Sequence, residues 1–446
     1  MRSFKSLLIS IIAVLLTLCF APNAWAFCGF YVSKADAKLY NKASQVVLAR
    51  DGDRTVLTMA NDYQGDVKDF ALVVPVPSVI KQEQVRVSNP KIIERLDAFS
   101  APQVYPAPPS SITESASQRR NERGENSLGV TVEAKFTVGE YDIVILSAKE
   151  SNGLETWLNQ NGYKIPRNAR RLFRPYIRQN MKFFVAKVNL EQFDESGNQF
   201  LRPLQISYNT AKFMLPIRLG TINSQSEQDV IVYLLSPKGQ IELTNYRTVK
   251  VPSNSTVPLF VKDEFGDFYK AMFQNNYERE DKKVAFLEYA WNIGSCDPCS
   301  ADPLNPEELK EAGVFWLNSD SYSDTFITRL HVRYTRNKFP EDLIFQETGN
   351  SEFFQGRYIL QHPFTGEMKC EAANNYQKSV RDRQEQEAQT LAQLTGWNIR
   401  DIRRKIQKNL HQQQSSTARH IFADNFADNS QYIVLARTSA SVANIP

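Results

Sequence analysis

The chain has few of the residues and motifs on which most enzymes rely. It contains 4 histidines in 446 residues, which leaves little material for metal-dependent or histidine-based catalysis. The motifs G-x-S-x-G, H-E-x-x-H, G-x-G-x-x-G and the Walker loop do not occur in it, which argues against the commonest hydrolase, zinc-protease and nucleotide sites. The net charge of +4 gives no electrostatic reason to expect nucleic-acid binding. No cofactor and no metal is expected.

Long apolar runs are also scarce, and the clear one lies at the start of the chain. Residues 7–20 form an apolar run of 14 residues that follows two basic residues. A transmembrane helix needs about 20 residues, so this run is short for one. Ala24 and Ala26 supply the small residues of a cleavage site. We predict a signal peptide over residues 1–26, no transmembrane span, and export to the periplasm or the exterior; an uncleaved anchor is the alternative.

The composition that is present suits a folded protein. Hydrophobic residues make up 42% of the chain and charged residues 23%, which is enough for one or two cores. We predict an α+β fold, with a mostly antiparallel β-rich body, short helices and a C-terminal helical segment. The predicted divisions are a signal peptide (1–26), an N-terminal β-rich region (27–100), a proline-rich and polar disordered linker (101–128), a main β-rich α+β domain (129–370) and C-terminal helices with a tail (371–446).

Local patterns predict the individual elements. Strands at 45–50 and 54–59 flank a glycine-containing turn, and strands at 131–138 and 141–148 flank Gly139, so each pair reads as a hairpin. Further strands are predicted at 70–77, 182–190, 204–208, 213–219, 229–235, 240–250, 283–291, 326–334, 342–346 and 357–361. Helices are predicted at 90–96, from 151 to the glycine at 162, at 168–179 and 267–277, after the N-cap Asn305, and at 374–395 and 398–410.

Four cysteines remain once the signal peptide is removed: Cys28, Cys296, Cys299 and Cys370. An even number in an exported chain indicates two disulfides. One pairing joins Cys28 to Cys370 and Cys296 to Cys299. The rival pairings join Cys28 to Cys296 or to Cys299, and the sequence leaves the choice open.

Cys296 and Cys299 form a C-x-x-C motif between a predicted strand and a predicted helix, as in thioredoxin-like redox sites. Two features favour a structural disulfide instead. The helix starts several residues past Cys299, beyond the short range of its dipole, and the charge of Asp297 disfavours a thiolate. A thiol–disulfide oxidoreductase is the alternative. A zinc site that adds Cys370 and His362 has no recognised ligand spacing.

Two further stretches carry charge in a regular pattern. Arg329, His331 and Arg333 share one face of a predicted strand and form a candidate anion-binding stripe; an exposed polar strand face is the alternative. Residues 398–410 form a helix with an apolar face flanked by basic residues. That helix could contact an anionic membrane surface or dock on its own domain.

Several strings carry a resemblance to a known family. They are Cys28-Gly29-Phe30-Tyr31-Val32, Ala71-Leu72-Val73-Val74-Pro75-Val76-Pro77, Lys212-Phe213-Met214-Leu215-Pro216-Ile217, Thr244-Asn245-Tyr246-Arg247, Ser295-Cys296-Asp297-Pro298-Cys299 and Thr328-Arg329-Leu330-His331-Val332-Arg333-Tyr334. Strings of this length are specific, and over residues 27–350 the chain resembles the exported bacterial family called domain of unknown function 2330. The resemblance implies export and a shared fold, and it implies no reaction. It does not transfer a disulfide pairing, because relatives carry a cysteine near positions 103–112, where this chain is proline-rich.

Taken together, these features predict an exported, non-enzymatic protein that binds an envelope or extracellular partner or has a structural role.

Overall fold

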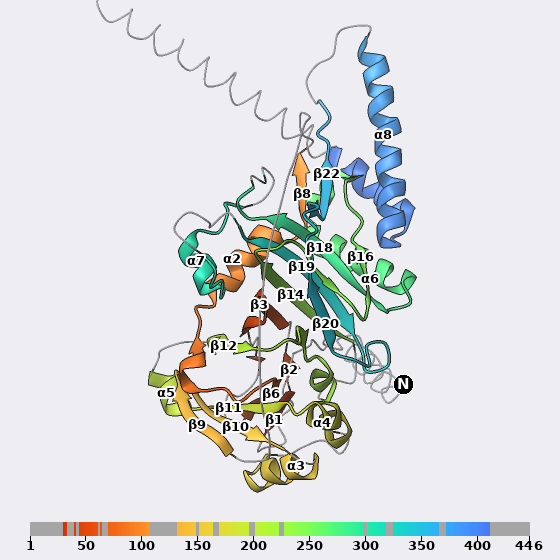
Figure 1. The fold of residues 1–446 in the computed structure, drawn as a ribbon. Coiled ribbons are helices and arrows are strands. Elements are labelled where there is room, and N and C mark those ends of the chain that lie inside the picture. Colours follow the sequence, from red (N-terminus) through yellow and green to blue (C-terminus); the bar gives the residue numbers. More distant parts are fainter. Residues whose placement is uncertain are drawn as a thin grey trace, which may run out of the picture. The chain divides into compact units, whose positions relative to one another are not determined.

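Strands form most of the body in the computed structural model of the protein (Figure 1). The structure describes residues 30–33, 40–41, 44–60, 63–64, 70–106, 132–148, 151–163, 169–195, 201–222, 227–295, 297, 301–317, 324–364 and 372–410. The predicted signal peptide, most of the predicted linker and all four cysteines of the mature chain lie outside these residues. The predicted α+β fold with a β-rich body is confirmed.

The described strands are β1 (Phe30–Ser33), β2 (Tyr40–Asn41), β3 (Ser44–Asp51), β4 (Arg54–Ala60), β5 (Tyr63–Gln64), β6 (Phe70–Val76), β7 (Val85–Val87), β8 (Gln103–Pro106), β9 (Val132–Val138), β10 (Tyr141–Ser147), β11 (Lys182–Val188), β12 (Leu204–Asn209), β13 (Met214–Leu215), β14 (Gln228–Ser236), β15 (Ile241–Leu243), β16 (Arg247–Lys250), β17 (Ser255–Val257), β18 (Val284–Asn292), β19 (Phe326–Tyr334), β20 (Leu343–Glu347), β21 (Phe354–Gln355) and β22 (Arg357–Leu360). The described α-helices are α2 (Lys91–Ser100), α3 (Ser151–Gln160), α4 (Ala169–Arg178), α5 (Leu190–Glu195), α6 (Phe265–Arg279), α7 (Pro306–Glu311) and α8 (Ala372–Thr395), and residues 399–410 form one more. Short 3-10 helices are η1 (Gln82–Gln84), η2 (Arg218–Ile222) and η3 (Leu259–Lys262).

The chain divides into two compact units. Unit 1 comprises Met1–Pro102, Thr113–Val251 and Glu280–Gln355, and unit 2 comprises Gln103–Ile112, Pro252–Arg279 and Gly356–Pro446. Unit 2 therefore collects three segments that are far apart in the sequence. The domain boundaries expected at residues 100, 128 and 370 stay predictions.

The largest sheet of unit 1 has nine strands, with β16, β18, β19, β14, β3, β4, β12 and β7 in order and β21 paired to β18. The predicted hairpin at 45–59 is confirmed as β3 and β4, which are antiparallel, and Gly52 takes the positive φ of 56° in the turn. β19 is an interior strand of this sheet and pairs antiparallel with both β14 and β18. A strand in this position is covered on both faces, and all but one residue of β19 is buried.

The second sheet of unit 1 has five strands in the order β1, β6, β11, β10, β9. Gly139 turns the predicted hairpin of β9 and β10 with a φ of 53°, where an L side chain would be strained. The strand predicted at 70–77 is β6, which ends at Val76, just before Pro77. Among the described residues, Pro75 pairs with Phe183 of β11, and the pairing of β1 with β6 extends from Phe70 to Val73.

Successive side chains of a strand point to opposite faces of its sheet, so their contacts show what covers each face. Leu72 and Val74 of β6 share one hydrophobic cluster with Leu330 and Val332 of β19, so the two sheets pack face to face. The other face of the five-stranded sheet is covered by α3 and α4. The other face of the nine-stranded sheet is covered by α2 and α7, which Figure 1 shows together beside β3 and β14. Unit 1 is thus a helix–sheet–sheet–helix stack.

One predicted strand is much shorter than expected. The sequence predicts a strand at 213–219, but only Met214–Leu215 pairs, and η2 follows. Pro216 cannot donate to a ladder, and the backbone N–H groups of Ile217 and Arg218 donate to the carboxylate of Asp342 at 2.9 and 3.1 Å. A side chain thus replaces the partner strand.

The strand predicted at 240–250 is broken into β15 and β16. The side chain of Asn245 lies at the break, where it donates to the Asp342 carbonyl at 2.7 Å and accepts from the Ile344 N–H at 3.1 Å. These bonds give the backbone a turn in place of a continuous ladder.

Unit 2 is built on a small parallel sheet, β17-β22-β8. Helices α6 and α8 cover it, and the buried residues of this core include Phe268, Met272, Tyr358 and Leu391. The first residues of the predicted linker form β8, which runs beside β22 in Figure 1. The helix predicted at 374–395 is confirmed as α8.

Candidate functional site

The three residues of the predicted anion-binding stripe lie on β19, on the sheet face that α2 and α7 cover. Arg329 is 6% exposed and His331 is 7% exposed. The alternative reading, an exposed polar strand face, is therefore wrong: β19 is a central strand and helices cover this face. Charged groups buried to this extent need partners.

Glu288 of β18 is the first partner, and it is fully buried. Its Oε2 accepts from Arg329 Nε at 2.6 Å, and its Oε1 lies 2.9 Å from His331 Nδ1. The pairing of β18 with β19 shifts between Leu287 and Tyr289, so Glu288 is the extra residue of a β-bulge. A bulge re-aims the side chain of its extra residue, and here it places the Glu288 carboxylate between the two cations.

Asp229 of β14 is the second partner. Arg333 holds it in a bidentate ion pair, with Nε–Oδ1 and Nη2–Oδ2 distances of 2.7 and 2.8 Å. His331 Nε2 lies 3.2 Å from Oδ1 of the same carboxylate. Burial alone would raise the pKa of Asp229, but the hydrogen bonds and charges of His331 and Arg333 outweigh it and lower that pKa to about 2.

His331 thus lies between two carboxylates, one on each of its ring nitrogens. Burial acts to lower the pKa of His331, but the charge of Glu288 and the hydrogen bonds to Asp229 and Glu288 outweigh burial, so the pKa is raised. The imidazolium form is favoured, since both ring nitrogens can then donate.

These ion pairs and hydrogen bonds extend from β19 to α2. Arg329 Nη1 donates to Oδ1 of Asp97 at 2.8 Å, and the hydroxyl of Tyr233 donates to the same oxygen at 2.8 Å. Gln45 donates to the Tyr233 hydroxyl at 2.8 Å, and burial raises the pKa of that hydroxyl. With His331 protonated, three cations (Arg329, His331 and Arg333) face three carboxylates (Asp97, Asp229 and Glu288).

We call these six residues the ion-pair chain. Its carboxylates occupy the positions that an external anion would take on Arg329, His331 and Arg333. An external anion ligand stays a prediction. The sequence pattern identified the three cations but missed the acids, which lie on other strands and on α2. The acids could have been found from the sequence, because Glu288 and Asp229 are charged residues within strands that are themselves expected to be buried.

The loop with the C-x-x-C motif follows β18. Its two cysteines lie outside the described residues, but Asp297 between them is described. Its carboxylate accepts from the Tyr289 hydroxyl at 2.9 Å and from Gln355 Nε2 at 3.1 Å. These bonds tie the loop to the end of the nine-stranded sheet.

The helix after the motif begins at Pro306, as predicted, with Asn305 as its N-cap. Asn305 Oδ1 accepts from the Glu308 N–H, and the Glu308 carboxylate accepts from the Asn305 N–H, both at 2.9 Å. Glu308 also pairs with Arg95 of α2 at 2.7 Å. The helix N-terminus is therefore satisfied by its own capping box.

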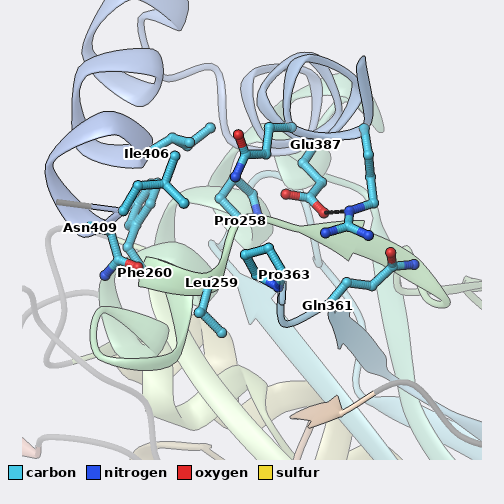
Figure 2. Close-up of a pocket in the computed structure, with 11 residues that line it drawn as sticks. Pro258, Leu259, Phe260, Gln361, Pro363, Glu387, Ile406 and Asn409 are labelled. Atoms are coloured by element: carbon cyan, nitrogen blue, oxygen red, sulfur yellow. Dashed lines mark ion pairs between the residues drawn. The ribbon is translucent and has the colours of Figure 1, made fainter. Parts of the chain in front are cut away.

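A second buried acid lies in unit 2. Glu387 of α8 is 5% exposed and lines a hollow of about 20 Å³. The labelled side chains of Pro258, Gln361 and Pro363 lie around it in Figure 2. Arg383 Nε lies 3.4 Å from Glu387 Oε1, yet neither atom makes a hydrogen bond among the described residues. Burial raises the pKa of Glu387 to about 7, against the opposing charge of Arg383.

The helix at 399–410 docks on its own unit. Ile402 is 1% exposed and belongs to the core of unit 2, and Ile406 packs against that core. Ile402 and Ile406 of the apolar face are thus covered by their own unit, and a membrane contact of this helix stays a prediction. Basic residues of this helix pair locally, as Lys405 does with Glu264 at 2.5 Å.

Within the described ranges, no group of three or more His, Cys, Asp or Glu side chains has the arrangement of a metal site. None of the helices described there has both the length and the apolar character needed to cross a bilayer.

No curated protein and no solved structure matches the chain. A family model does match it, over residues 22–346, and its description is "Uncharacterized protein conserved in bacteria (DUF2330)". The matched span contains the ion-pair chain and the C-x-x-C loop. The chain therefore belongs to the bacterial family of domain of unknown function 2330.

Proposed function

We propose that the protein is exported and acts outside the cytoplasm as a non-enzymatic binding or structural protein. The observation that carries this proposal is the anchoring of the C-x-x-C loop. Asp297 is held by Tyr289 and Gln355, and the next helix starts seven residues after Cys299, at Pro306. A catalytic C-x-x-C uses a helix N-terminus to lower the pKa of its first thiol, whereas here the helix N-terminus comes seven residues after Cys299 in the sequence and is internally capped.

The ion-pair chain supports the same reading. A catalytic acid or base must reach a substrate, whereas Glu288, Asp229 and His331 are buried and contact one another and two arginines. A buried polar network whose members satisfy each other rigidifies a core and specifies one arrangement. It links three strands, β14, β18 and β19, to α2, which suits that structural task.

Export rests on the signal-peptide pattern of residues 1–26. The test is N-terminal sequencing of the protein recovered from fractionated cells. We expect a mature chain that starts at Phe27 in the periplasmic or secreted fraction. Recovery of chains that start at Met1 in the cytoplasm would refute export.

A thiol–disulfide oxidoreductase is the second candidate, because Cys296 and Cys299 follow directly on β18. The reduction potential of this pair separates the two functions. A potential below about −300 mV is typical of structural disulfides and is the result we expect. A value in the range of disulfide isomerases, near about −180 mV, would instead favour redox catalysis. Activity in an insulin-reduction assay that is lost in Cys296→Ser would do the same.

A further inference from the structure

The Glu387 hollow of unit 2 has the features of a ligand site. Glu387 is only 5% exposed, and a carboxyl group buried in this way normally has hydrogen-bond partners that replace the lost water. Glu387 Oε1 and the facing Arg383 Nε both lack them among the described residues. One unused acceptor and one unused donor thus line the same hollow.

The hollow is small, which limits what can enter it. A volume of about 20 Å³ is close to the space that one water molecule requires, roughly 10–15 Å³ on this measure. It therefore admits the tip of a group that reaches in from solvent rather than a whole molecule. Pro258, Leu259, Phe260 and Pro363 give it apolar walls.

The charge of the hollow depends on the protonation state of Glu387. Among its described lining residues, Arg383 and Glu387 are the two that ionise, and Gln361, Gln384 and Asn409 contribute carboxamides. With Glu387 neutral, the hollow contains one guanidinium charge and one carboxylic O–H donor. Such a site suits an anion with two acceptor oxygens, because charge-assisted hydrogen bonds from a guanidinium are the strong ones.

We propose that this hollow binds a carboxylate at the tip of an extended ligand, such as a peptide C-terminus or an acidic side chain. Arg383 donates to one oxygen of that carboxylate, and the protonated carboxyl group of Glu387 donates to the other. An ammonium group is disfavoured there by the charge of Arg383. This binding would hold whether or not the chain is exported.

Binding at this site is strongest in mildly acidic solution. Burial raises the pKa of Glu387 to about 7, so the carboxyl group is neutral below that pH and ionised above it. An ionised Glu387 repels a second carboxylate and can no longer donate. Above pH 7, Glu387 must therefore take up one proton for each carboxylate ligand that binds.

The test is a titration of the full mature chain with N-acetylglycine, followed by ligand-detected NMR at pH 6 and pH 8.5. N-acetylglycinamide is the neutral probe of nearly equal size. We expect the carboxylate to bind at pH 6, the amide to bind at least roughly tenfold more weakly, and carboxylate affinity to fall roughly tenfold or more by pH 8.5.

Three variants of α8 complete the test. Glu387→Gln cannot ionise, so its affinity should be the same at both pH values. Arg383→Gln removes the charged donor and should weaken binding at pH 6 roughly tenfold or more. The control Arg381→Gln removes an exposed charge of the same helix and should bind as the unaltered protein does. Absence of carboxylate binding, equal binding of the amide, or no effect of Arg383→Gln would leave a site for an internal water only and would overturn the proposal.

Discussion

Asp229 of unit 1 and Glu387 of unit 2 are buried to nearly the same extent, but their pKa values are shifted in opposite directions. Asp229 is 6% exposed and Glu387 is 5% exposed. Asp229 receives two short bonds from Arg333 and a contact from His331, and its pKa falls to about 2. Glu387 has one arginine at 3.4 Å without a hydrogen bond, and its pKa rises to about 7.

The comparison shows that burial does not by itself decide the charge of an acid. Desolvation favours the neutral form of both carboxyl groups, and donors of good geometry reverse that preference only at Asp229. Asp229 is therefore expected to stabilise the fold as an ion. The poorly paired acid of unit 2 is expected to destabilise it whenever it is ionised.

The largest effect is expected from Glu288→Ala. This change leaves Arg329 and His331 buried without the carboxylate between them, and breaking a buried pair in this way costs about 3–5 kcal/mol. Urea unfolding at pH 7 would measure the loss. The control is Glu83→Gln, because the Glu83 side chain is 71% exposed. Equal stability of the two variants would show that the ion-pair chain contributes nothing to the fold.

Asp229→Asn is expected to cost about 2–3 kcal/mol at pH 7, from a pKa lowered by nearly two units. The folded pKa lies below the unfolded value of about 3.9. This stabilisation is therefore fully present above that value and is lost as pH falls toward about 2. Acid unfolding followed by circular dichroism should show a shallower pH dependence between pH 4 and 2 in the variant. An unchanged acid profile would mean that Asp229 is not selectively stabilised as an ion.

Glu387→Gln should change the free energy of unfolding in the opposite direction, toward greater stability. The folded pKa of Glu387 lies above its unfolded value of about 4.3, so the folded state binds more protons than the unfolded state between these two pH values. Stability then falls as pH rises through this window. We expect the variant to be more stable than the unaltered protein by about 3 kcal/mol at pH 8 and nearly equally stable at pH 4. Destabilisation at pH 8 would show that the ionised acid has partners in solution.

The sequence was sufficient for most elements and for half of the ion-pair chain. The alternation in residues 326–334 predicted β19 and put Arg329, His331 and Arg333 on one face. It did not show that this face is buried, because burial depends on α2 and α7, which are separated from β19 in the sequence. The bulge that turns Glu288 toward Arg329 also could not be predicted, because the alternation of apolar and polar residues along a strand does not reveal an extra residue.

The Glu387 hollow could not be predicted for a related reason. Glu387 is one acid among many polar residues of α8, and helical periodicity alone marks it as a solvated position. Its burial follows from contacts with η3, the residues after β22 and the helix at 399–410, which only the folded unit brings together. The packing of the helix at 399–410 could not be predicted either: its apolar face was visible in the sequence, but the surface that covers Ile402 and Ile406 was not.

The smallest effect is expected at Glu385, which tests whether a low pKa alone implies stability. Arg403 holds Glu385 with distances of 2.9 and 2.5 Å and, together with Gln389, lowers its pKa to about 2, as low as that of Asp229. The pair is exposed, however, with 47% and 41% of the two side chains accessible. Exposed pairs are screened by salt and give up side-chain entropy when they form. We expect Glu385→Gln to unfold at the same urea concentration as the unaltered protein, whereas Asp229→Asn does not. Raising the salt concentration to about 1 M, where the screening length is about 3 Å, should return the pKa of Glu385 toward its ordinary value in an NMR titration and leave that of Asp229 low. A large destabilisation by Glu385→Gln would show that the contrast between the two acids does not come from burial.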